Sequence, residues 1–184
     1  MSLKLVHLAA EIEHSDEFHV ARLILLLKAA AGRSDKPMQG IMKLAKMDFL
    51  LRYPNCLVRA LKAIGKESKV QEIPLEELNT IEARMIRFRY GPWDKRYRRW
   101  ISVLVAKGLA HTYLEGRTVN VKLTNAGIEV AAQLSELAEF RPIANRSQVV
   151  VSAVGPYTAT KLKDFIYDVF PEIVDMQWGR HIEL

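Results

Sequence analysis

Hydrophobic residues recur with a helical period in the segment that follows Gly91-Pro92. They stand at Trp93, Tyr97, Ile101, Leu104 and Val105. These positions share one face of an α-helix. Pro92 suits the first turn because its fixed φ angle matches helical geometry, and Lys107-Gly108 supplies a cation and a glycine for the helix end. The pattern predicts a helix from Pro92 to Lys107 that buries this apolar face.

Polar and apolar residues then alternate on both sides of a short glycine-containing turn. The alternation covers Leu109–Leu114 and Arg117–Leu123 around Glu115-Gly116, which predicts a hairpin because glycine tolerates positive φ. Thr124 stands at the N-cap position of a further helix. The apolar stripe of that helix is Ile128, Ala131, Ala132, Leu134 and Leu137. The order helix, hairpin, helix predicts a winged helix whose wing is the hairpin.

Helices are also predicted ahead of this unit. Ser15 and Asp16 can cap a helix from Glu17 to Ala31 that Gly32 ends. This helix is apolar on most sides, so it is either the centre of a compact core or a helix covered on one face by a partner subunit.

A second helix is predicted to open at Ser34, Asp35 and Pro37 and to stop at Tyr53-Pro54, because proline disfavours a helical residue before it. A third runs from Asn55 to Ile64. The polar segment Lys66–Asn79 has no strong period and is predicted to be a mobile insertion.

Short strands are predicted on either side of the winged-helix unit. Met85–Tyr90 alternates, and Gln148–Val154 is rich in β-branched residues. A last helix is predicted after Thr158 or Thr160. The predicted fold class is mainly α with a small β wing: a winged helix-turn-helix domain with N-terminal helices over residues 1–140, and a C-terminal extension of a strand plus a helix over residues 141–184.

The C-terminal extension carries more apolar surface than a free appendage exposes to water. Its predicted interface residues are Phe165, Ile166, Val169, Phe170 and Trp178. Aromatic anchors of this kind are typical of permanent interfaces. We expect either the chain's own domain or a partner protein to cover them.

The composition of the chain indicates the cellular compartment in which the protein works. The 184 residues include a single cysteine, Cys56, which excludes a disulfide within the chain and predicts a reducing, cytoplasmic compartment. The longest apolar stretch, Val20–Ala31, is interrupted by Arg22 and Lys28 and is too short to span a bilayer. The sequence therefore predicts a soluble protein without a membrane partner.

The net charge of +6 is concentrated in one segment. Seven basic residues stand between Glu82 and Trp100 against two acidic ones. The predicted contacts to DNA or to an acidic partner are Arg87, Arg89, Lys95, Arg96, Arg98, Arg99 and, at the wing tip, Arg117. Arginine forks bidentately onto phosphate and onto guanine. Alternatively, these arginines form a solvent-exposed helix face that pairs with the acidic residues Glu72, Glu76 and Glu77 of the same chain.

No catalytic or metal-binding constellation is present in the sequence. The five histidines lie apart, and neither an HExxH pair nor a phosphate-binding or nucleophile-elbow motif occurs. We therefore expect a protein that is not an enzyme and that uses no metal or cofactor.

Two stretches resemble known families. The run VLVAKGLAHTYLEGRTVNVKLTNAG resembles the core of MarR/PadR-type winged helices. A larger part, notably LLLKAAAGR, KLAKMDFLLRYP and RYGPWDKRYRRWISVLVAKGLA, is similar to the middle components of bacterial ABC three-component conflict systems, which include the small subunit of Lamassu defence.

The second resemblance implies a non-enzymatic adaptor in antiviral defence. Such a subunit would sit with an SMC-like ABC ATPase and an effector and would help to couple sensing of double-stranded DNA to effector release. No catalytic residues carry over. The alternative is an autonomous, dimeric winged-helix regulator of transcription.

Overall fold

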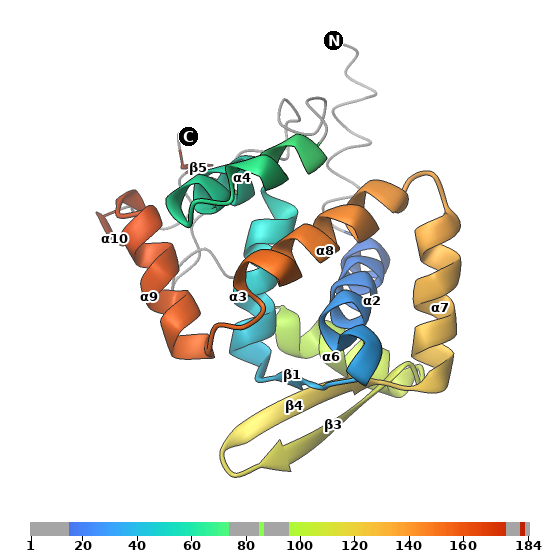
Figure 1. The fold of residues 1–184 in the computed structure, drawn as a ribbon. Coiled ribbons are helices and arrows are strands. Elements are labelled where there is room, and N and C mark those ends of the chain that lie inside the picture. The colour runs from blue at the N-terminus through green and yellow to red at the C-terminus, as the bar shows by residue number, and fades with distance from the viewer. Residues whose placement is uncertain (1–14, 74–84, 87–95, 176–180, 183–184) are drawn as a thin grey trace.

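The computed structural model describes residues 15–73, 85–86, 96–175 and 181–182. It is mainly helical with a small antiparallel sheet, so the predicted α+β class is confirmed at this level (Figure 1). The helices are α2 (Asp16–Ala31), α3 (Ile41–Arg52), α4 (Pro54–Ala63), α6 (Tyr97–Ala106), α7 (Asn125–Glu136), α8 (Arg141–Val154), α9 (Ala159–Val169) and α10 (Glu172–Asp175), with 3-10 turns η1 (Gly32–Ser34) and η2 (Glu67–Glu72). The strands are β1 (Met38–Gln39), β2 (Met85–Ile86), β3 (Ala110–Glu115), β4 (Thr118–Leu123) and β5 (His181–Ile182).

Helix α2 lies at the centre of the molecule. It packs against α6, α7, α8 and strand β4, and Figure 1 shows it passing between α7 and α8 above the sheet. Every residue from Val20 to Leu27 except Ala21 is buried. The Ser15 hydroxyl accepts a hydrogen bond from the Phe18 N–H (3.2 Å), as the sequence predicted for a cap. The interpretation as a central core helix is therefore confirmed.

The segment before α3 differs from its prediction. Met38 and Gln39 form strand β1, paired with Val121 and Asn120 of β4, and the helix starts only at Ile41. Met38 is buried, so packing of its side chain favours the extended backbone over an earlier helix start. The predicted break at Tyr53-Pro54 is confirmed, because α3 ends at Arg52 and α4 begins with Pro54 in its first turn.

The three-stranded sheet has the order β1-β4-β3. Its hairpin turns at Gly116-Arg117, one residue later than predicted, since Glu115 pairs with Thr118. The cap of α7 is as predicted, with the Thr124 hydroxyl accepting from the Gly127 N–H (3.1 Å). A Cβ on Gly127 would lie 2.0 Å from the carbonyl oxygen of Leu109, the residue before β3, so only glycine lets α7 start this close to it.

The predicted strand Gln148–Val154 is wrong, because these residues belong to helix α8. Three consecutive valines favour a strand by local propensity. However, Ile143, Ser147, Val150 and Val154 are buried at helical spacing, and α8 packs along α2 and α3. Tertiary packing of this face outweighs the local preference.

The C-terminal extension packs on the rest of the chain. Thr158 caps α9, as one of the two predicted candidates. The α9 helix contacts α3 and α4, and the Phe170 ring meets the Phe49 ring edge to face with centroids 5.8 Å apart. One continuous core includes residues from both sides of residue 140.

Of the two predicted ways of covering this apolar face, the structure shows packing on the chain's own domain. Ile166 and Phe170 have no exposed surface, so no partner can contact them. Phe165 and Val169 are partly buried against the same core. Trp178 lies outside the described residues. The apolar face is covered in cis because α3 and α4 offer it a complementary apolar surface.

Two peripheral segments complete the fold. Strand β2 pairs antiparallel with β5 near the C-terminus; residues 87–90 of the predicted strand lie outside the described part. The predicted mobile insertion begins with the ordered turn η2, whose Val70 packs on the core and is followed by the buried Ile73. In the described ranges, no helix has the length and apolar character needed to cross a bilayer.

Candidate nucleic-acid interface

Helix α6 presents a buried face and a basic face. Tyr97, Ile101 and Leu104 are buried as predicted, whereas Arg98, Arg99 and Ser102 are exposed. Val105 was predicted to be buried but is 40% exposed. Trp100, which the sequence pattern did not select, is fully buried and rotates the buried stripe away from Val105. Trp93 lies outside the described residues.

The predicted basic residues fall into three groups. Arg87, Arg89 and Lys95 lie outside the described residues. Arg96 and Arg99 have structural contacts: the Arg96 guanidinium lies over the Trp100 ring (4.9 Å to its centroid), and Arg99 pairs with Asp16 (2.6 Å). Asp16 also accepts a hydrogen bond from the Trp100 indole N–H (2.8 Å). These contacts attach the start of α6 to the start of α2.

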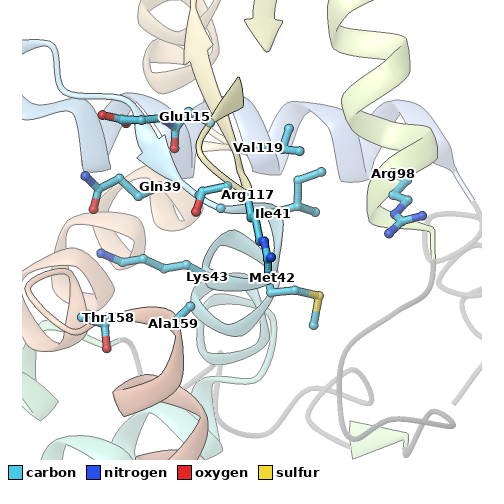
Figure 2. Close-up of a pocket in the computed structure, with 13 residues that line it drawn as sticks. Gln39, Ile41, Met42, Lys43, Arg98, Glu115, Arg117, Val119, Thr158 and Ala159 are labelled. Carbon is cyan, nitrogen blue, oxygen red and sulfur yellow. The ribbon is translucent and has the colours of Figure 1, made fainter. Parts of the chain in front are cut away.

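Arg98 and Arg117 form the third group, because they line the same pocket. Arg98 comes from α6 and Arg117 from the hairpin turn. Within the described part of the chain, neither guanidinium has an acidic partner. We call this cavity of about 640 Å³ the basic pocket. Figure 2 shows the end of the Arg117 side chain beside Met42, at the start of α3, and Arg98 farther off on α6.

The opposite side of the basic pocket carries a third cation. Lys43 extends there, toward Gln39 and Thr158 (Figure 2), and its ammonium donates to the Gly155 carbonyl (2.7 Å). Partial burial lowers the pKa of Lys43, because an ammonium loses hydration there. The only acidic side chain in the lining is Glu115. The pocket therefore has three cations and one anion.

Two helices begin at the wall of the basic pocket. Helix α3 follows Gly40, which provides no side-chain cap, and α9 follows Thr158. The first N–H groups of a helix and its dipole give this end a partial positive charge. Both helix ends therefore attract an anion, as the three cations do.

Asn120 contributes a buried amide to the same lining. Its side-chain Nδ2 donates to the Glu115 carboxylate (2.9 Å), while the Oδ1 atom has no hydrogen-bond partner. It is the one such buried side-chain atom among the described residues. Sequence reasoning missed Asn120, since an asparagine in a strand of alternating residues is expected to face solvent.

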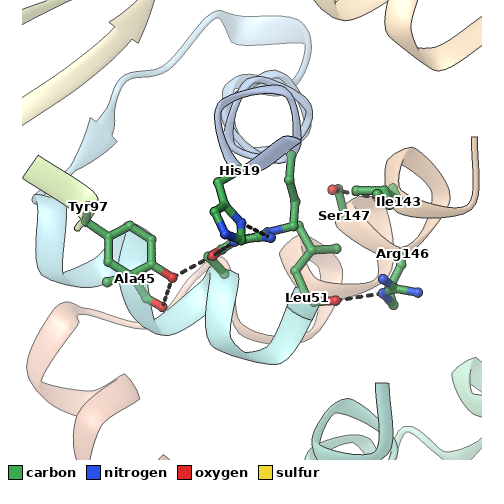
Figure 3. Close-up of polar contacts among 9 residues, drawn as sticks. His19, Ala45, Leu51, Tyr97, Ile143, Arg146 and Ser147 are labelled. Carbon is green, nitrogen blue, oxygen red and sulfur yellow. Dashed lines mark hydrogen bonds and ion pairs between the residues drawn. The ribbon is translucent and has the colours of Figure 1, made fainter. Parts of the chain in front are cut away.

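A buried polar network fixes α6 to the core (Figure 3). Arg22 on α2 binds Asp48 on α3 through two hydrogen bonds of 2.7 and 2.8 Å. The Tyr97 hydroxyl donates to the second Asp48 oxygen (2.5 Å), and the His19 ring lies within hydrogen-bond distance of Arg22 (2.8 Å). The network joins α2, α3 and α6, and so it holds the exposed Arg98 face in place.

The charges in this network stabilise one another. Burial alone would raise the pKa of Asp48, but the charge and hydrogen bonds of Arg22 and the Tyr97 hydroxyl outweigh it and hold the pKa below its usual value. Burial, reinforced by the Asp48 charge, raises the pKa of Tyr97. Arg22 and Asp48 are therefore an ion pair at neutral pH, and Tyr97 stays protonated as the donor.

Other potentially reactive groups do not converge on the pocket. Cys56 is buried, and burial raises the pKa of its thiol, which keeps the nucleophilic thiolate scarce. The described residues include no group of three side chains able to hold a metal ion. The chemistry that the site offers is anion binding by cations and helix N-termini.

No protein-family model, curated protein or solved structure matches the chain.

Proposed function

We propose that the chain is a non-enzymatic winged-helix adaptor subunit of a bacterial SMC-like ABC ATPase defence complex, and that it contacts double-stranded DNA through the basic pocket. One observation carries the DNA contact. Arg98 and Arg117, which come from separate elements, have no acidic partner in the described chain and line the same pocket as the first residues of α3.

The order of the elements supports the winged-helix interpretation. Helix α6 leads directly into the β3–β4 hairpin, and β1, which precedes α3, adds the third strand. In this interpretation α6 is the recognition helix, which enters the major groove in helix-turn-helix proteins. The hairpin is the wing, and Arg117 at its tip reaches the phosphate backbone.

The side chains favour phosphate contacts over base recognition. Guanidinium groups bind phosphate bidentately and stay charged at every physiological pH. The exposed face of α6 carries Arg98, Arg99 and Ser102 and no asparagine or glutamine that would read adenine. We therefore expect DNA binding that depends strongly on salt and weakly on sequence.

The adaptor part of the proposal rests on the resemblance to middle components of three-component systems. Because α9 is covered in cis, the ATPase and effector would bind elsewhere. Apolar candidates are Leu114 on the hairpin, which is 72% exposed, and Leu137 after α7, which is 49% exposed.

Charge reversal tests the DNA contact. In the double variant Arg98→Glu, Arg117→Glu, affinity for a duplex should fall by at least tenfold, since a charge-assisted contact contributes roughly 1.5–3 kcal/mol. Fluorescence anisotropy with a labelled duplex measures this. The control is Arg141→Glu, an exposed arginine at the start of α8 outside the basic pocket, which should bind like the wild type apart from a small change in net charge. Equal affinity of the double variant and the control would refute the assignment.

Purification from the native host tests the adaptor. The tagged chain should bring down a coiled-coil ATPase and an effector, encoded next to it, in fixed ratio. The alternative function, an autonomous dimeric regulator, predicts instead a homodimer that purifies alone and protects an inverted repeat near its own gene. Recovery of the homodimer with such an operator would contradict the adaptor.

A further inference from the structure

The unpartnered amide oxygen of Asn120 indicates a missing hydrogen-bond donor. Asn120 has no exposed surface, and both it and its partner Glu115 line the basic pocket. A buried acceptor left without a donor destabilises the protein, and native structures rarely keep one without a reason. Because Asn120 belongs to the pocket lining, a bound ligand that carries a donor would satisfy this acceptor.

The other groups of the basic pocket specify an anion. Arg98, Arg117 and the start of α3 line the pocket together, and Lys43 extends toward the start of α9 on the other side. Helix N-termini with nearby cations are established phosphate-binding arrangements. At about 640 Å³, the cavity falls within the range of pockets that hold small molecules.

A DNA backbone supplies only half of this chemistry. Its phosphates and deoxyribose oxygens are acceptors, so they can satisfy the cations but not Asn120 Oδ1. A free nucleotide carries an anionic phosphate and, within the same small molecule, hydroxyl and amino donors. We propose that the basic pocket binds a small phosphorylated ligand with a hydrogen-bond donor, of the nucleotide class, with the phosphate on Arg98, Arg117 and the α3 N-terminus and the donor on Asn120.

Such a ligand would compete with DNA, because both would use Arg98 and Arg117. This regulatory consequence rests on the proposed function, whereas ligand binding itself does not. The test therefore measures the two separately: nucleotide binding by calorimetry without DNA, and duplex binding by anisotropy without nucleotide.

Calorimetry with three probes tests the ligand class. AMP carries both the anion and the donors, inorganic phosphate carries the anion in a molecule too small to span the pocket, and adenosine carries the donors alone. We expect AMP to bind wild type at least tenfold more tightly than either fragment. Asn120→Val should reduce AMP affinity to that of phosphate, and Arg117→Ala should weaken AMP and phosphate together, while Arg141→Ala leaves both unchanged.

Two results would overturn the inference: no AMP binding at millimolar concentration, or AMP and phosphate binding equally to the wild type. The wild-type comparison decides the matter even when Asn120→Val does not fold. AMP binding without duplex binding would refute the proposed DNA contact and leave this inference standing. Duplex binding without AMP binding would do the reverse.

Discussion

Replacing Asp48 with asparagine should lower the free energy of unfolding by about 3–5 kcal/mol at pH 7. The amide has nearly the same shape as the carboxylate but leaves the fully buried Arg22 guanidinium without a counter-charge. It also weakens the acceptor of the Tyr97 hydroxyl, which attaches α6 to α3. Urea unfolding followed by circular dichroism measures the loss.

The control for this prediction is Asp164→Asn. Asp164 pairs with Lys163 on the surface of α9, with most of its side chain accessible to solvent, and exposed pairs contribute only about 0–1 kcal/mol. A loss at Asp48 as small as the loss at Asp164 would show that the network does not hold α6 in place.

The free energy of unfolding should depend on pH through the titration of the same carboxylate, Asp48. The folded protein holds the pKa of Asp48 below its ordinary value of 3.8. The stabilisation by Asp48 is therefore complete above about pH 4 and is lost as pH falls through the folded pKa. The difference in unfolding free energy between wild type and Asp48→Asn should be constant from pH 7 to about pH 5 and should shrink below about pH 4.

Phe170→Ala should cost about 3–5 kcal/mol, through lost burial and the cavity left behind. Phe170 has no exposed surface, meets Phe49 edge to face and lies under the Arg59 guanidinium. Arg59 in turn pairs with Glu172, just beyond Phe170. Leu137→Ala, at a half-exposed position, should change the stability little.

Phe170→Ala also shows whether α9 is part of the chain's own core or a surface that binds a partner. If Phe170→Ala kept wild-type stability but no longer co-purified with a partner, α9 would be a partner interface. A destabilised monomer supports the packing in cis.

The sequence predicted the elements whose signals are local. Ser15 and Thr124 cap their helices because the hydroxyl and its N–H partner lie three residues apart. The hairpin follows from alternation around Gly116, and the register error of one residue arose because Glu115 and Arg117 are equally polar neighbours of that glycine. Strand β1 was missed because its two residues are extended only through pairing with β4, about eighty positions away.

Of the residues in the basic pocket, only the exposed arginines could be predicted from the sequence. Arg98 and Arg117 were identified from local charge and from position on the helix and turn. Lys43 and Asn120 were not, because the fold alone brings them to the same cavity. Likewise, Asp48 could not be recognised as the partner of Arg22, which lies 26 positions away. Its neighbours Met47 and Phe49 made that segment read simply as an apolar helix.

The salt dependence of duplex binding measures whether the basic pocket contacts the DNA backbone. Each phosphate contact adds about 0.9 to the magnitude of the slope of log affinity against log salt concentration. We predict a steep negative slope for wild type and for Arg141→Glu, flattened by about 1.8 in the Arg98→Glu, Arg117→Glu double variant. Identical slopes for the double variant and wild type would show that Arg98 and Arg117 make no phosphate contact.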